Sequence, residues 1–184
     1  MVAHLVQWDL LPSAVGDVGV AASAEGVILC SLGVSRDVLQ QQLRDLGPGK
    51  VLRRGGVQLE QGLRELGQYL QGQRKGFSVP LVPTSGTPFQ RQVWASLLTI
   101  PWGQTRSYAW VAQDLGRPRA VRAVGQAVGA NPIAIMIPCH RVIASDGSLG
   151  GFSAGLGCKR QLLAIETTQE LSAHPRADAK QLVA

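Results

Sequence analysis

The 184-residue sequence predicts an α/β (α+β) protein of two domains, a small N-terminal antiparallel sheet with helices and a mostly helical C-terminal domain with a helix-turn-helix. Short alternating segments near the N-terminus are typical of strands, whereas capped amphipathic segments dominate the second half. A segment rich in proline, glycine and serine separates the two. The expected boundaries are residues 1–80 for a scaffold domain, 81–87 for a linker, 88–170 for the second domain and 171–184 for a tail.

The first domain is expected to hold three strands and two helices. Ser35 can cap the first helix, which Gly47-Pro48 would end. The second helix, from Leu59 to about Leu70, repeats leucine at helical spacing. No motif in this half carries chemistry, so we expect it to be a scaffold. The predicted strands cover residues 4–10, 16–23 and 26–33.

The second domain opens with a helix start signal. Thr87 can act as the N-cap, Pro88 takes the first helical position, and Gln90 lies three residues after the cap, which is the pattern of a capping box. Pro101 would stop this helix. Its apolar residues lie at helical spacing and are expected to build core.

Two short helices joined by a glycine turn follow, and this pattern predicts a helix-turn-helix. Ser107 can cap the first helix, expected from Tyr108 to Leu115. The second is expected to begin at Pro118 and to reach about Gly129. Arginines gather at its start, the end of the second helix that meets DNA in such motifs. These arginines are Arg117, Arg119 and Arg122.

The charge balance favours a polyanionic partner for the second half. The chain has 18 Lys and Arg against 12 Asp and Glu, a formal charge of +6 and a pI of ≈ 9.8. Most of the excess lies after residue 86. A basic surface is the electrostatic footprint of nucleic-acid binding, although a modest excess also serves solubility.

The composition favours a cytoplasmic protein. No unbroken apolar run approaches the length of a membrane span, and the N-terminus lacks the basic and apolar regions of a signal peptide. Cys30, Cys139 and Cys158 are odd in number and widely spaced, and no CxxC or HxxxH spacing occurs. We therefore expect free thiols, and neither a metal nor a cofactor.

A thiol and an imidazole lie side by side, at Cys139 and His140, after the apolar run 133–137. A cysteine with an ordinary pKa of about 8.5 is protonated at neutral pH and needs a base or a cation to become a nucleophile. Adjacent strand residues point to opposite sides, so the chain must bend here, and Pro138 can provide the bend. Glu166 can orient the histidine. A lone pair of this kind is more often a packed thiol beside a surface imidazole.

Residues 86–166 together closely resemble the C-terminal domain of the O6-alkylguanine-DNA alkyltransferases, the methylated-DNA–protein-cysteine S-methyltransferase family. The resemblance rests on the Pro-Cys-His-Arg-Val core, the Arg-Ala-Val-Gly helix, the Asn131-Pro132 break and the final Leu-Leu-x-x-Glu, in that order and spacing. It implies a DNA repair protein whose N-terminal domain is ribonuclease-H-like.

The resemblance also implies a mechanism. Cys139 takes the alkyl group from O6-alkylguanine, and from O4-alkylthymine, once and irreversibly. His140 acts as a base through a water molecule, and Glu166 orients it. Asn131 braces the turn before the cysteine. Tyr108 helps to rotate the target nucleotide out of the duplex and can donate a proton to guanine N3.

Double-stranded DNA is the implied partner, bound through its minor groove by a monomer, with clustering on DNA left open. Arg122 would fill the place of the flipped base, and the small residues Ala123 and Gly125 would allow close approach. Arg117 and Arg119 lie at the same end of the helix. The residues expected to line the substrate pocket are Met136, Val142, Gly150, Phe152 and Ser153, with the Ser153 backbone donating to O6.

Two residues depart from the family pattern in the loop 150–155. Phe152 stands where a tyrosine is usual, and Ala154 stands where many members have glycine. The phenylalanine ring can still stack on a base but has no hydroxyl to donate. The extra methyl group narrows the pocket, so we expect good methyl transfer and poorer reaction with benzyl groups.

Three other functions are weighed against alkyl transfer. A related lesion-binding protein that recruits other repair factors would lack the cysteine. A Cys-His-Glu hydrolase would form a thioester that water removes, and it would turn over. A plain helix-turn-helix regulator gives the Cys139 and Glu166 pattern no purpose.

Overall fold

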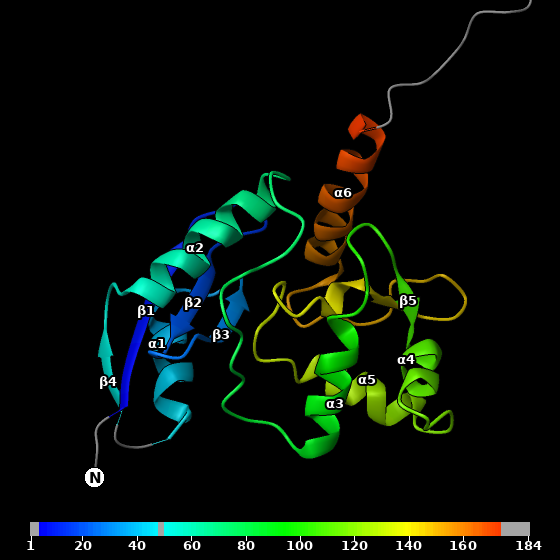
Figure 1. The fold of residues 1–184 in the computed structure, drawn as a ribbon, viewed down its shortest axis with the longest axis horizontal. Helices are drawn as coiled ribbons and strands as arrows, with labels where there is room; N and C mark the ends of the chain where they lie inside the picture. Colours follow the sequence, from blue (N-terminus) through cyan, green and yellow to red (C-terminus); the bar gives the residue numbers. More distant parts are fainter. Residues whose placement is uncertain (1–3, 48–49, 174–184) are drawn as a thin grey trace, which may run out of the picture.

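The computed structural model describes residues 4–47 and 50–173 (Figure 1). Its N-terminal part is a four-stranded sheet of order β3-β2-β1-β4 with two helices. Strands β1, β2 and β3 are antiparallel, which confirms the predicted sheet, and β4 runs parallel to β1. The elements are β1 (His4–Leu11), β2 (Val18–Ala22), β3 (Val27–Leu32), α1 (Arg36–Asp45), β4 (Lys50–Arg53) and α2 (Val57–Leu70).

Strand β4 is missing from the sequence prediction. It has 4 residues, and its partner β1 lies far earlier in the chain. A parallel pair needs a crossover connection, which here consists of β2, β3 and α1, so no hairpin signal marks the second strand. The connection strand–helix–strand is consistent with the expected ribonuclease-H-like arrangement.

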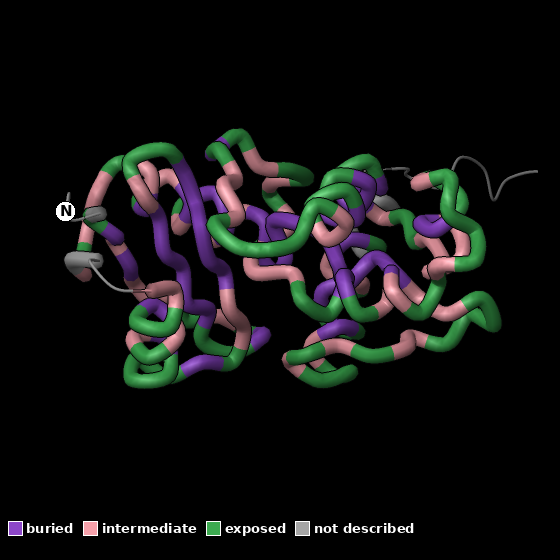
Figure 2. The backbone as a smooth tube through the Cα atoms, turned by 90° about the horizontal axis from the view of Figure 1, so that it is seen from below, coloured by how far each residue is buried: buried purple, intermediate pink, exposed green. Residues whose placement is uncertain are grey.

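Helices cover both faces of the sheet. Helix α1 packs Leu39 and Leu43 against Val6, Trp8 and Ile28 in one core cluster. Helix α2 packs on the strands within a second, larger cluster, which continues into the C-terminal half. All five residues of β2 are buried because both faces are covered, as Figure 2 shows for the central strands.

The outer edge of β3 joins the two halves. The Val27 backbone exchanges hydrogen bonds of 2.8 Å with the segment 80–82, and the Cys30 backbone exchanges hydrogen bonds of 2.9 Å with the segment 132–134. An open edge strand can pair with other chains, and these two segments cover it. The second segment also holds the loop before Cys139 against the scaffold.

The second half is mostly helical. Helix α3 (Pro88–Leu97) starts with the predicted capping box of Thr87 and Gln90. Helix α4 (Tyr108–Asp114), capped by Ser107, and helix α5 (Val121–Gly129) form the helix-turn-helix. The remaining elements are β5 (Arg106–Ser107), a 3₁₀ turn η1 (Cys139–Arg141), β6 (Val142–Ile143), which is parallel to β5, and α6 (Leu156–Ala173).

Several helix boundaries differ from the prediction, and two of them bear on the site. Helix α5 begins at Val121, not at Pro118, because a turn closed by Ala120 N donating to Arg117 O at 2.9 Å holds Pro118 in its second position. Helix α6 reaches Ala173, so the predicted tail 171–184 begins inside it, and residues 174–184 lie outside the described part. Within the described ranges, no helix combines the length and the apolarity needed to cross a membrane.

Candidate active site

The chain turns sharply before Cys139. Residues 133–137 do not form a regular strand, because Ile135 takes a left-handed conformation with φ of 68°. The Asn131 side chain clamps this turn: its Nδ2 donates to Ile137 O at 2.9 Å, and its Oδ1 accepts from Ile133 N at 3.0 Å. Pro138 then precedes the 3₁₀ turn that starts at Cys139. The bend that the cysteine and histidine require is therefore present.

Cys139 lines a cavity of about 410 Å³ between α4, α5 and the loop before α6. That volume is within the range of roughly 300–1,000 Å³ typical of small-molecule sites. Five residues that the sequence analysis assigned to separate roles meet around the thiol. They are Tyr108, Gly125, Asn131, Phe152 and Ser153.

Gly150 lies at the rim of this group. Its φ is +65°, and a Cβ added there would come within 3.1 Å of the Tyr108 hydroxyl oxygen. A side chain at this position would therefore push Tyr108 away from the cavity. Gly150 acts as a spacer beside the tyrosine and is not itself a lining residue.

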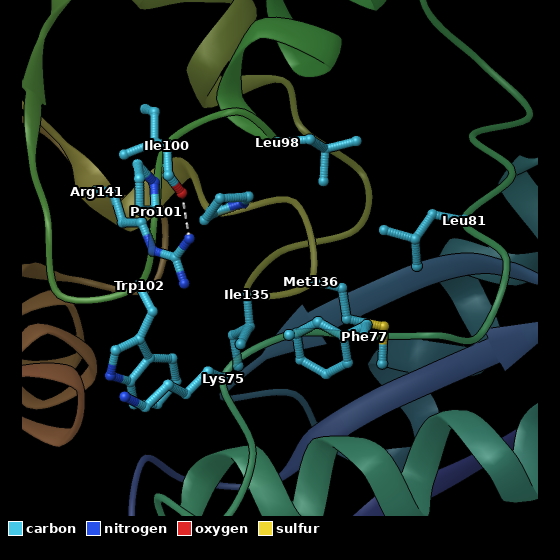
Figure 3. Close-up of a pocket in the computed structure, with 12 residues that line it drawn as sticks. Lys75, Phe77, Leu81, Leu98, Ile100, Pro101, Trp102, Ile135, Met136 and Arg141 are labelled. Carbon is cyan, nitrogen blue, oxygen red and sulfur yellow. Dashed lines mark hydrogen bonds between the residues drawn. The ribbon is translucent and has the colours of Figure 1, made fainter. Parts of the chain in front are cut away.

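Met136 and Val142 do not line the Cys139 cavity, which corrects their expected placement. The left-handed Ile135 reverses the chain, so Ala134 faces the Cys139 cavity while Met136 faces a separate cavity of about 310 Å³. There the Met136 side chain lies beside Phe77 (Figure 3). Val142 is fully buried in β6.

His140 and Glu166 form a buried pair behind the thiol. Both residues are 0% exposed, and His140 Nε2 lies 2.7 Å from Glu166 Oε1. Arg141 donates from Nε to both carboxylate oxygens, at 3.1 and 3.0 Å, and Gly103 N donates to Oε2 at 2.9 Å. Burial alone would raise the Glu166 pKa, but the hydrogen bonds and charges of His140 and Arg141 outweigh it and lower that pKa to about 2. Glu166 is therefore ionised.

The thiol and the imidazole are both neutral at rest. Burial raises the pKa of Cys139, although the Asn131 side chain and the Lys159 charge oppose this shift. Burial lowers the pKa of His140 against the pull of Glu166. His140 Nδ1 is buried and has no hydrogen-bond partner among the described residues. The site therefore pairs a protonated thiol with an imidazole that is free to accept a proton.

Three residues of the site were missed by sequence reasoning. Tyr69, from α2, places its hydroxyl group at Glu166 and 3.2 Å from His140 Nε2. Arg141 follows the Cys-His pair directly, and this adjacency was a usable signal. Lys159 is fully buried and donates from Nζ to Val142 O at 2.5 Å and to Leu149 O, tying β6 to the pocket loop. Nothing local marks Tyr69.

The predicted DNA-contacting residues lie in the turn before α5 and in α5 itself. Arg117 and Arg119 are exposed in the turn, where the Arg117 guanidinium lies 5.3 Å from the centre of the Phe89 ring. Arg122 is exposed in the first turn of α5, and Ala123 beside it is half-buried. Because Gly125 of the same helix lines the Cys139 cavity, the arginine surface and the thiol are joined through α5.

The site thus combines a cavity-lining thiol and a buried His-Glu pair with a neighbouring helix-turn-helix that carries exposed arginines. Comparison with known proteins agrees. The family model described as 6-O-methylguanine DNA methyltransferase, DNA binding domain, matches residues 88–168. The inducible methylated-DNA–protein-cysteine methyltransferase of Bacillus subtilis (strain 168) is 42% identical over 160 residues, covering 86% of this chain and 89% of that protein. The chain belongs to the methylated-DNA–protein-cysteine methyltransferase family.

Solved structures support the same assignment across both halves. The Mycobacterium tuberculosis O6-methylguanine methyltransferase superposes with a TM-score of 0.75 at 34% identity, covering 95% of this chain and 96% of that chain. Mycobacterium tuberculosis OGT in complex with DNA superposes with a TM-score of 0.73 at 34% identity, covering 90% and 94% of the two chains.

Proposed function

We propose that this protein repairs DNA by moving the alkyl group of O6-alkylguanine, and of O4-alkylthymine, onto Cys139. One observation carries the proposal: the Cys139 thiol lines a cavity while the buried His140–Glu166 pair lies behind it. A lesion-binding protein needs the cavity but not the pair. A helix-turn-helix regulator needs neither.

The transfer is balanced in protons and electrons. The thiol proton passes through a water molecule to His140 Nδ1, and sulfur attacks the alkyl carbon. The S–C bond forms as the C–O6 bond breaks, and the electron pair of the broken bond stays on guanine. Guanine then gains a proton at N3, for which Tyr108 is the donor. The Tyr108 phenolate regains a proton from solvent as the His140 imidazolium releases its own, so the net transfer is one proton from Cys139 to guanine. The product is a thioether, so each molecule reacts once.

DNA is the proposed partner, approached by α5 and the preceding turn. The exposed Arg122 suits insertion into the space that a flipped base leaves, and Arg117 and Arg119 suit phosphate contacts. Half-buried small residues such as Ala123 permit the helix to approach the narrow minor groove. Phe152 would stack on the flipped base and the Ser153 backbone would donate to O6, since both line the cavity. We propose a monomer that works in the cytoplasm, where its three free thiols stay reduced.

The test is the mass of the protein after incubation with a duplex that carries one O6-methylguanine. We expect a gain of one methyl group on the Cys139 peptide, in stoichiometric yield and without turnover. Cys139→Ala should gain nothing, and Cys158→Ala should react as the wild type does. Tight binding without a mass change would overturn the proposal in favour of lesion binding. Repeated turnover would favour the hydrolase.

A further inference from the structure

Tyr69 connects the N-terminal scaffold to the reactive cluster. It lies near the end of α2, its side chain is fully buried, and its ring stacks on Phe77 with ring centres 5.0 Å apart. The Trp102 ring meets it edge-on at 4.8 Å. Its hydroxyl group donates to Glu166 Oε1 and lies 3.2 Å from His140 Nε2. The hydroxyl is thus held between the two members of the pair.

Counting hydrogens around His140 Nε2 restricts its protonation. Tyr69 has one hydroxyl hydrogen, and Glu166 accepts it. Glu166 is ionised and has no hydrogen to give, since its pKa is about 2. Arg141 only donates: its Nε donates to Glu166, its Nη1 donates to Ile100 O at 2.6 Å (Figure 3), and its Nη2 donates to the Tyr69 oxygen at 3.5 Å. Both groups facing Nε2 therefore present lone pairs, and only a protonated Nε2 satisfies them.

The consequence reaches the other ring nitrogen. A neutral imidazole with its hydrogen on Nε2 carries a lone pair on Nδ1, the buried atom without a partner among the described residues. A tyrosine hydroxyl that donated to Nε2 instead would favour the opposite tautomer, with Nδ1 protonated and unable to act as a base. The commitment of the Tyr69 hydrogen to Glu166 prevents that arrangement.

We propose that Tyr69 is a positioning residue of the reaction: its hydroxyl group donates to Glu166 and holds the carboxylate against His140 Nε2, which keeps the Nε2–H tautomer and leaves Nδ1 as the proton acceptor for Cys139. The proposal rests on the proposed function for the role of Nδ1. The tautomer itself is a property of the free protein. A residue of the N-terminal half therefore completes an active site whose other members all lie in the C-terminal half.

The first experiment measures the tautomer directly. Long-range proton–nitrogen correlation NMR of the ¹⁵N-labelled full chain distinguishes the two ring nitrogens, and the His140 signals are assigned by their loss in His140→Gln. We expect a protonated Nε2 and an unprotonated Nδ1 in the wild type. An Nδ1–H tautomer in the wild type would overturn the proposal without any variant. This measurement needs no DNA, so it decides the tautomer even if methyl transfer is not observed.

The second experiment removes only the hydroxyl group. In Tyr69→Phe the Glu166 carboxylate still accepts from Nε2, so we expect the Nε2–H tautomer to persist and the Nε2–H proton signal to shift upfield as the carboxylate loses its anchor. We also expect a single-turnover rate of methyl transfer about 10-fold below wild type, the size of losing one hydrogen bond to a charged group. The matched control is Phe77→Leu, which loosens the stack on the Tyr69 ring but keeps the hydroxyl group. It should lower the thermal midpoint and leave the Nε2–H signal and the rate unchanged. A wild-type Nε2–H signal and rate in Tyr69→Phe would show that Tyr69 is structural only.

Discussion

Two buried cysteines, Cys30 and Cys139, lie close to the same junction and have different fates. Cys30 is 1% exposed in β3 and Cys139 is 7% exposed, and burial raises the pKa of both thiols. Asn131 and Lys159 oppose the rise only at Cys139, which also lines a cavity and is followed by His140. Burial is therefore not what separates them. Access and a neighbouring base are.

The largest expected difference is in labelling by a small thiol reagent. Iodoacetamide should modify Cys139 in the native protein and leave Cys30 unmodified until denaturant unfolds the sheet, because only Cys139 faces a cavity. Peptide mass spectrometry against time measures both, and the half-buried Cys158 is an internal reference. Equal labelling of Cys30 and Cys139 in the native protein would contradict the proposed difference in access to the two thiols.

Removing the Glu166 charge behind the histidine should leave Cys139 almost as unreactive toward alkylated DNA as Cys30. For Glu166→Gln we expect methyl transfer to slow on the order of 1,000-fold, within the usual range for loss of a general base. Single-turnover quench kinetics measures this. Glu65→Gln is the matched control. This buried carboxylate accepts from Ser78 N at 2.7 Å and from Val79 N at 3.1 Å, and it has no part in the proposed reaction. It should cost stability but keep the rate.

The Glu166 carboxylate should also make the free energy of unfolding depend on pH. The Glu166 pKa is lowered from 4.5 to about 2 in the folded protein, so its contribution is complete above about pH 4.5 and is lost as the pH falls toward 2. The contribution is about 3 kcal/mol. Urea unfolding from pH 6 to pH 2 should show a steeper decline for the wild type than for Glu166→Gln. Parallel curves would contradict the assigned pairing.

The smallest expected effects concern the pocket loop. Phe152 lines the cavity, so Phe152→Ala should slow transfer from DNA by about 10-fold through lost base stacking. Ala154 is half-buried and is not among the lining residues, which favours a small steric effect of its methyl group on the transfer of bulky groups. Ala154→Gly should therefore change methyl and benzyl rates by less than about 3-fold. A large gain for benzyl alone would restore the original expectation.

Local patterns account for most of what could be predicted. Capping signals at Ser35, Thr87 and Ser107 each mark a helix start that the structure confirms, because a cap is a contact between residues three apart. The prediction that a helix starts at Pro118 is wrong, because a proline with a helical φ suits a turn equally well. The domain boundaries and the roles of the site residues remain predictions.

Contacts between distant segments account for what could not be predicted. Strand β4 pairs with β1 across a helical crossover, and Met136 is turned away from the thiol by a left-handed Ile135 that no apolar pattern announces. Val142 faces the core because β6 pairs with β5. Each depends on a register or a chain reversal that is settled only when the whole core packs.

The sequence alone indicated the thiol, its histidine and the glutamate, since two are adjacent and the third ends the amphipathic segment 158–166. Only the folded chain decided how they work. Burial holds the thiol protonated and the histidine neutral, while Arg141 and Tyr69 converge on Glu166 from η1 and α2. Desolvation and hydrogen-bond direction are properties of a packed interior, and here they depend on residues that lie far apart in the sequence.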